Sequence, residues 1–293
     1  MTHPMPVAQK RWSLKDLYED QKGFEKDITT IEKAAADFEK LRPGLKNEIS
    51  EADFLSAIKT YEAIARLAHR LGSYAGLLFA EDTGNQSALV LVARTEQLSA
   101  EIGNRTLFFN LWWKDLPEAD AQRLMESAGD YRYWLEEMRH FKPHTLSEPE
   151  EKIINTKNVT GVNALTNLYD SMTNRYVFKL ELDGEVKEMT RGELMTLVRD
   201  ADPHLRARAY QELYRVYGAD GDILGQMYQT IVRDWRNEEV ALRHHKSPIS
   251  ARNLANDLPD EVIDLLLEVA QKNTAVFQRF FKLKARLLKM ERL

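Results

Sequence analysis

The chain has 293 residues, of which 43% are hydrophobic and 30% are charged, and its formal net charge is −5. This length is enough to bury a sizeable core in one large domain or two ordinary ones. The sequence contains no cysteine, which excludes disulfides, thiolate nucleophiles and cysteine-ligated zinc or iron–sulfur centres in this stretch. Basic and acidic residues are interspersed, so nucleic acid is a disfavoured partner.

Two further features bear on localisation. The sequence has no run of 18 apolar residues that would predict a membrane span, and the first eleven residues contain prolines and polar groups but no apolar segment typical of a secretory signal. Since a chain without cysteine also suits a reducing compartment, the sequence predicts a cytoplasmic protein.

Apolar residues at helical spacing dominate the first half of the chain. They predict a helix over about 24–38, with Arg42-Pro43-Gly44 after it. A long helix follows Ser50, which with Asp53 resembles a capping box, and ends near Asp82. A third helix is predicted over 85–113. Shorter helices are expected after Leu116-Pro117, over 130–141, and in two pieces around Gly161 between 147 and 174.

One segment breaks the helical pattern. Tyr176–Leu180 is rich in strand-forming residues, Asp183-Gly184 is a turn signal, and Val186–Met189 can pair back. This predicts one small β-hairpin at 176–189, which must pack on helices because an isolated hairpin is barely stable. Thr190 and Glu193 then predict a capped helix.

The remaining pattern is again helical. Helices are predicted over 202–218, over 220–243 and, without a stop signal, from Pro259 to Leu293. In the second of these, Leu224, Met227, Tyr228, Ile231, Trp235 and Val240 are expected to point inward. The last helix stays apolar to its final residue, whereas chain termini are usually polar. We therefore expect the chain to stop inside an architecture whose next element is missing.

The expected fold class is mainly α, with long antiparallel helices. A weak boundary lies between Pro143 and Pro149. It divides an amino-terminal helical lobe, 1–145, from a second domain, 146–293, that holds the hairpin and further helices.

Histidine spacing does not predict a metal site. A helical zinc protease needs His-Glu-x-x-His, in which two histidines hold the ion and the glutamate acts as base, and this motif is absent. His140 and His144 have the spacing, but Pro143 interrupts the helix between them. His244 and His245 are neighbours that would point about 100° apart on a helix. We predict no catalytic, cofactor-binding or metal-binding residue in this chain.

Other polar and aromatic groups have ordinary structural interpretations. The run Arg243–Lys246 is expected to be a solvated helix end, and His69 a surface residue. The paired glutamates at 136–137, 150–151 and 238–239 are expected on solvated faces. The aromatic cluster Phe108-Phe109 and Trp112-Trp113 could line a peptide groove, but core packing is favoured, because large aromatic side chains dominate core burial.

Five segments together resemble one known family, in order and over nearly the whole chain. The opening Arg11-Trp12-Ser13-Leu14-Lys15-Asp16-Leu17-Tyr18 is similar to the Trp-x-Leu-x-x-Leu-Tyr start of oligoendopeptidase F proteins. The other four resembling segments are Leu71–Asp82, the hairpin around Asp183-Gly184, Asp234–Arg243, and Ala251 through Leu258–Val262 to Leu288.

The resemblance implies the amino-terminal portion of a zinc metalloendopeptidase of the thimet-oligopeptidase-like class. The implied fold is a largely helical, channel-bearing ellipsoid that admits short peptides and excludes folded proteins. The family's His-Glu-x-x-His motif lies downstream of every residue in this chain. Zinc, and a carboxyl-terminal catalytic portion as partner, are therefore implied for the full-length enzyme only. These helices would form channel wall and restrict substrate size, and the chain alone is predicted to be inactive. The alternative is a non-catalytic helical binding or scaffold protein.

Overall fold

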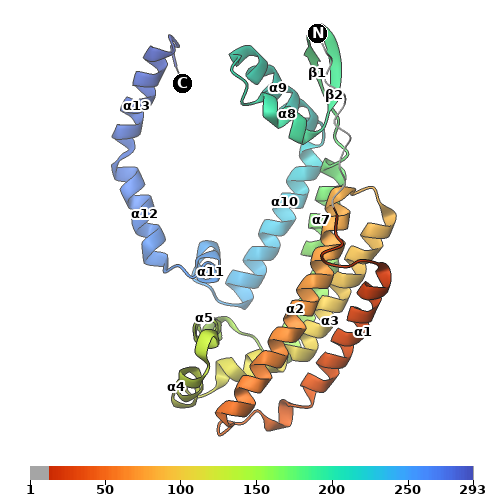
Figure 1. Cartoon of the computed structure of the whole chain (residues 1–293). Coiled ribbons are helices and arrows are strands. Elements are labelled where there is room, and N and C mark those ends of the chain that lie inside the picture. Colours follow the sequence, from red (N-terminus) through yellow and green to blue (C-terminus); the bar gives the residue numbers. More distant parts are fainter. Residues whose placement is uncertain (1–12, 293) are drawn as a thin grey trace.

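The computed structural model describes residues 13–292 and shows a mainly helical chain with one two-stranded hairpin (Figure 1). The mainly α fold class is confirmed. Arg11 and Trp12 of the opening motif, and Leu293, lie outside the described residues. None of the described helices is both long enough and apolar enough to cross a membrane.

Three antiparallel helices, α1 (Gln21–Glu39), α2 (Glu51–Glu81) and α3 (Gln86–Asp115), form the largest layer (Figure 1). They pack on one another pairwise. The α1 stripe is buried as its spacing predicts, by Phe24, Ile28, Ile31, Ala35 and Phe38. Burying each large apolar side chain contributes about 1.5–3 kcal/mol, which outweighs the modest helix propensity of these residues. Ser50 caps α2 by accepting the Asp53 backbone N–H, as predicted.

Two short helices, α4 (Glu118–Ser127) and α5 (Arg132–His140), close the end of this layer where α3 stops. The indole of Trp113 is completely buried and donates to the Leu135 carbonyl at 2.8 Å. Phe108 and Phe109 are buried with it, whereas Trp112 is half-buried. Three of the four aromatic side chains therefore lie in the core, as favoured from the sequence, and Trp112 lies at its edge.

Helices α6 (Glu148–Thr160) and α7 (Val162–Thr173) are the two pieces predicted around Gly161. Ser147 and Glu150 form a capping box at the start of α6. Helix α6 lies along α3, and α7 leads to the hairpin, so this pair connects the two ends of the molecule (Figure 1).

The hairpin consists of β1 (Phe178–Leu182) and β2 (Glu185–Met189), paired antiparallel in the register Leu180–Lys187. Asp183 and Gly184 have φ of 58° and 83°, which is the left-handed turn expected of Asp-Gly. The inner face of the hairpin packs on α8 (Arg191–Leu197) and α9 (Pro203–Ala219). The small core that results is formed by Phe178, Leu180, Leu194 and Ala209.

The last elements depart most from the sequence predictions. The helix predicted over 220–243 is α10 (Gly221–Trp235) followed by a π-helix (Arg236–Leu242). Its predicted inward residues are not buried, and Tyr228 is 73% exposed. The single helix predicted from Pro259 is divided at Asn273 into α12 (Asp260–Lys272) and α13 (Thr274–Leu287). With α11 (Pro248–Ala255), these helices form an arm that turns away from α10 (Figure 1).

Candidate functional site

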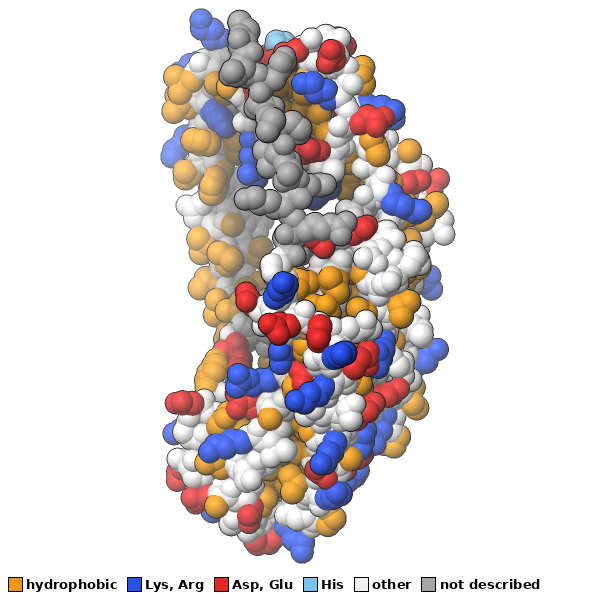
Figure 2. Space-filling model, turned by 45° about the vertical axis from the view of Figure 1, so that its right-hand side comes forward, with side chains coloured by type: hydrophobic (Ala, Val, Ile, Leu, Met, Phe, Trp, Pro, Cys, Tyr) orange, Lys and Arg blue, Asp and Glu red, His pale blue; other side chains and the backbone are white. Residues whose placement is uncertain are grey.

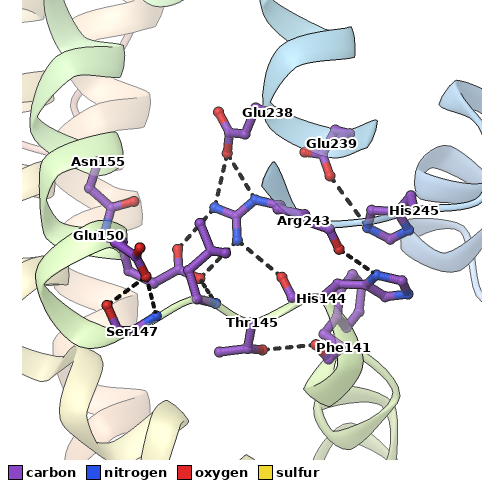
Figure 3. Close-up of polar contacts among 12 residues, drawn as sticks. Phe141, His144, Thr145, Ser147, Glu150, Asn155, Glu238, Glu239, Arg243 and His245 are labelled. Carbon is purple, nitrogen blue, oxygen red and sulfur yellow. Dashed lines mark hydrogen bonds and ion pairs between the residues drawn. The ribbon is translucent and has the colours of Figure 1, made fainter. Parts of the chain in front are cut away.

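A cluster of ionisable side chains joins the α5–α6 connection to the π-helix and the turn after it. We call it the Arg243 cluster, and Figure 3 shows its arrangement. Its members are His144, Glu151, Glu238, Glu239, Arg243 and His245.

Arg243 lies at the centre of the cluster. Its Nη1 and Nη2 donate to the two carboxylate oxygens of Glu151 at 2.8 and 2.9 Å, a bidentate pair. Its Nε and Nη2 also donate to Glu238 Oε1 at 3.0 and 2.9 Å. The Arg243 and Glu151 side chains are only 16% and 10% exposed. One guanidinium therefore neutralises two carboxylates in a region with little water.

The π-helix explains how Glu238 reaches Arg243. Residues five apart on an α-helix point about 140° apart and cannot share one partner. Here the Arg243 N–H donates to the Glu238 carbonyl at 2.9 Å, so the widened turn brings both residues to one side. His244 then adopts φ of 60°, and the chain reverses direction. Such π turns occur often at functional sites.

Two histidines stack beside the guanidinium. The rings of His144 and His245 are 3.6 Å apart and 14° from parallel. His144 Nδ1 donates to the Arg243 carbonyl at 2.8 Å, and Nε2 of the buried His245 lies 3.4 Å from Glu239 Oε2. Two stacked imidazoliums would repel each other, which disfavours a positive charge on the buried His245 ring.

Burial sets the protonation preferences of the cluster. It lowers the pKa of His245, with the charges of His144 and Arg243 adding to the effect. Burial also raises the pKa of Glu239. For Glu151, burial opposes ionisation, but the hydrogen bonds from Arg243 and from the Leu146 backbone outweigh it, and the pKa is lowered.

The arrangement is different from the one predicted for these residues. The prediction that Arg243–Lys246 is a solvated helix end is wrong for two of the four residues: the Arg243 side chain is only 16% exposed and His245 is buried, whereas His244 and Lys246 are exposed. The solvated-face prediction is also wrong for Glu151, which is buried. His140 and His144 share no helix face, because His140 ends α5 and His144 lies in the following turn. His69 is exposed, as predicted.

The donor set of the cluster does not fit zinc. Within residues 13–292, no group of three or more histidines and carboxylates is placed to hold a metal ion. The carboxylate of Glu151 is engaged by a guanidinium, and His144 Nδ1 by a carbonyl. The zinc that the resemblance implies therefore finds no ligand set among these residues.

A polar groove of about 1210 Å³ runs between α2–α3 and α6–α7. Small residues from α2 and α3, among them Gly72, Gly76 and Gly103, leave it open. Amide side chains come mainly from the other wall: Asn155, Asn158, Asn163, Asn167 and Asn174. Amides both donate and accept hydrogen bonds, so the groove can bind neutral polar groups.

An uncovered apolar face occupies α12 and α13. Its members are all exposed: Val262, Leu265, Leu266, Leu267, Val269, Val276, Phe277, Phe280, Phe281, Leu283 and Leu287. Soluble monomers rarely expose contiguous apolar patches larger than a few hundred Å². The space-filling view in Figure 2 shows the contrast, since acidic and basic side chains intermingle across much of the surface it presents.

The fold and these sites define a helical module with a polar groove and an apolar face that lacks a cover.

The Oligopeptidase F family model matches residues 112–178, from the end of α3 into β1. Oligopeptidase PepF of Bacillus subtilis is 23% identical over 294 residues, which cover 97% of this chain and 43% of that protein. Group B oligopeptidase PepB of Streptococcus agalactiae is 22% identical, covering 96% and 47%.

Solved structures show the same fold. Oligoendopeptidase F from Enterococcus faecium superposes with a TM-score of 0.77 at 22% identity, covering 94% of this chain and 55% of that one. The crystal structure of a “putative peptidase” from Chlamydophila abortus gives a TM-score of 0.58 at 18% identity, covering 98% of this chain and 49% of that one. The chain spans about half the length of the curated relatives it matches. The resemblance to the amino-terminal portion of oligoendopeptidase F is thereby confirmed.

Proposed function

We propose that this chain is the amino-terminal part of a zinc-dependent oligoendopeptidase that hydrolyses short peptides inside a channel. In this proposal the described helices supply channel wall and restrict substrate size. The zinc site is contributed by a carboxyl-terminal catalytic portion, and this chain alone is inactive. The proposed compartment is the cytoplasm, with neither nucleic acid nor membrane as partner.

The observation that carries the proposal is the apolar face of α12 and α13. Eleven large apolar side chains on two consecutive helices are exposed there, and covering them stabilises the folded chain by roughly 25 cal/mol for each Å² removed from water. The matched relatives are about twice as long as this chain, which covers 43% and 47% of two of them. A following catalytic portion is therefore the cover that we propose.

The same proposal divides the chain into an amino-terminal lobe, 1–145, and the start of the peptidase domain, 146–293. The largest core cluster draws on residues 17–138, whereas the hairpin core draws on residues 176–217. Helix α6 packs on α3 and on α7, which leads to the hairpin, and the Arg243 cluster joins α6 to the π-helix after α10. The Arg243 cluster therefore has a structural role in this proposal: it holds the start of the α11–α13 arm against α6.

The polar groove favours a second candidate, a non-catalytic helical binding or scaffold protein. It offers amide groups and a large open volume. The two candidates differ in what covers the apolar face and in whether peptide bonds are cleaved.

Zinc content and peptide cleavage separate the candidates. The chain of 293 residues and the product of the reading frame extended beyond it are each dialysed and assayed with a quenched short peptide and with a folded protein. We expect zinc and cleavage of the short peptide in the extended product only, and no cleavage of the folded protein. Zinc retained stoichiometrically by the shorter chain, or an extended product without activity, would sink the proposal.

A matched pair of variants tests the apolar face itself. Phe280→Asp with Leu287→Asp in the extended product places charge on the proposed interface, and we expect cleavage to be lost. Lys282→Asp, on the same helix and also exposed, serves as the control and should retain activity. Full activity in the double variant would show that this face is not covered by the catalytic portion.

A further inference from the structure

A second hollow, of about 530 Å³, lies between the end of α3 and the turns that flank it at residues 42–45 and 142–148. We call it the Lys114 pocket. Phe108, Leu111 and Asp115 follow one line along α3 and form its floor, with Trp112 and Lys114 on the two sides of that line. Leu45 and Leu146 add apolar wall from the turns.

The charges in the Lys114 pocket do not cancel. Glu148 is neutralised by Arg42, which donates two hydrogen bonds at 3.0 and 2.6 Å, and by Lys152 at 2.7 Å. Lys142 lies 3.7 Å from the exposed Asp115. The ammonium group of Lys114 has no ion pair or hydrogen bond to any described residue. Its Nζ lies 6.0 Å from the centre of the Phe141 ring.

The neighbourhood compensates the charge of Lys114 only in part. Burial lowers the pKa of its ammonium group, while Glu151 favours the charge and Arg243 opposes it. Glu151 is already held by both Nη atoms of Arg243, so it is not available as a partner. A half-buried cation without a partner is costly, and an anion from outside would relieve that cost.

A residue that lines the pocket also has an unpaired donor. The indole N–H of Trp112 is buried below the pocket wall and meets no acceptor in the described part of the chain. Buried donors are nearly always hydrogen-bonded in native proteins, so an unpaired one calls for an explanation. The pocket thus offers one half-buried cation beside apolar side chains, with the Trp112 N–H beneath its wall.

We propose that the Lys114 pocket binds the carboxyl terminus of a short peptide that ends in an apolar residue. The terminal carboxylate lies at Lys114 Nζ, and the last side chain packs on Phe108 and Leu111. The Trp112 side chain turns on binding, so that its indole N–H, buried in the free protein, donates to a peptide carbonyl. A simple aliphatic acid supplies the first two groups but not the carbonyl. The inference goes beyond the proposed function because it places a peptide-end site on these helices, independent of zinc and of cleavage.

Three probes separate the sources of the carboxylate: acetyl-phenylalanyl-leucine, its carboxamide, and 4-methylpentanoate. Binding to the chain of 293 residues is measured by calorimetry, and the Trp112 indole signal by ¹H–¹⁵N spectra, assigned through Trp112→Phe. We expect saturable binding of the dipeptide acid with a shift of the Trp112 signal, and affinity about tenfold or more weaker for the other two probes. Equal binding of acid and carboxamide, or no binding, overturns the proposal, and equal binding of 4-methylpentanoate overturns its peptide part.

Variants at the two lysines provide the matched control. Lys114→Met keeps the length of the side chain and removes the charge, and we expect the dipeptide affinity to fall about tenfold or more. Lys114→Arg should retain most of it. Lys142→Met changes an exposed lysine of the same pocket and should leave the affinity within about twofold, as expected of a screened surface charge. Unchanged melting temperatures establish that the variants fold, and unchanged affinity in Lys114→Met contradicts the proposal.

Discussion

At the scale of the residue, the Arg243 cluster shows why the sequence could not predict which charged side chains are buried. Glu150-Glu151 and Glu238-Glu239 have the same composition as the surface pair Glu136-Glu137. Only the fold decides that Glu151 meets Arg243, 92 residues away in the chain. A buried pair of this kind adds little net stability as a whole, but the loss of one partner is costly because the other stays buried.

Glu151→Gln tests this arrangement through pH. The pKa of Glu151 is lowered from 4.5, so its ionised form stabilises the folded state above that value, and the contribution is lost as pH falls through the lower folded pKa. We expect the variant to be about 2 kcal/mol less stable in urea at pH 7, with a flatter dependence of stability between pH 7 and pH 3.

Asp37→Asn provides the comparison for Glu151→Gln. Asp37 pairs with Lys40 at 2.7 Å, but both side chains are more than half exposed. Such surface pairs contribute little, so this variant should unfold at the same urea concentration as the parent at pH 7. An equal loss of stability in both variants would contradict the special role of the buried pair.

At the scale of the element, local signals located most helix starts and the hairpin. Ser50, Thr190 and Asp202 each accept a backbone N–H at the helix start that their sequence context predicts. The failures were interruptions without a Gly or Pro signal. The π-helix after Trp235 and the break at Asn273 depend on contacts and caps that helical periodicity does not encode.

Gly184→Ala tests the hairpin turn. Gly184 has φ of 83°, where an added Cβ is strained whatever space surrounds it, and an L residue in the left-handed region costs about 1–2 kcal/mol. We expect a loss of about that size in thermal or urea unfolding. Gly44→Ala is the matched control, since Gly44 has no positive φ and nothing lies within 4 Å of its added Cβ. Unchanged stability in Gly184→Ala would mean that the turn rearranges.

At the scale of the whole molecule, the arm of α11–α13 distinguishes this chain from a closed helical bundle. Its apolar residues keep helical spacing, and the sequence led us to expect that an element to pack on them is missing. The structure leaves them exposed along both α12 and α13. The proposed function assigns the catalytic portion as their cover. In this chain they are exposed to solvent, and this exposure affects how the chain behaves in solution.

Exposed apolar faces bind hydrophobic dyes and promote self-association. In the chain of 293 residues, Phe280→Asp with Leu287→Asp should lower dye fluorescence and self-association while helical circular dichroism stays unchanged, because both side chains are exposed. Lys282→Asp should change neither. Dye fluorescence that is unaffected by the double variant would locate the dye elsewhere, for example in the polar groove.

The sequence by itself determined the helical class, the hairpin and its turn, most caps and the family resemblance, because those features depend on residues within a few positions of one another. It also predicted a core role for Phe108, Phe109, Trp112 and Trp113 from their size, and all but the half-buried Trp112 are buried. Only the tertiary structure decided that His144, Glu151 and Arg243 meet, and that the Lys114 ammonium and the Trp112 indole N–H have no hydrogen-bond partner among the described residues. Such contacts join residues from different elements, and their energies depend on burial, which no local pattern specifies.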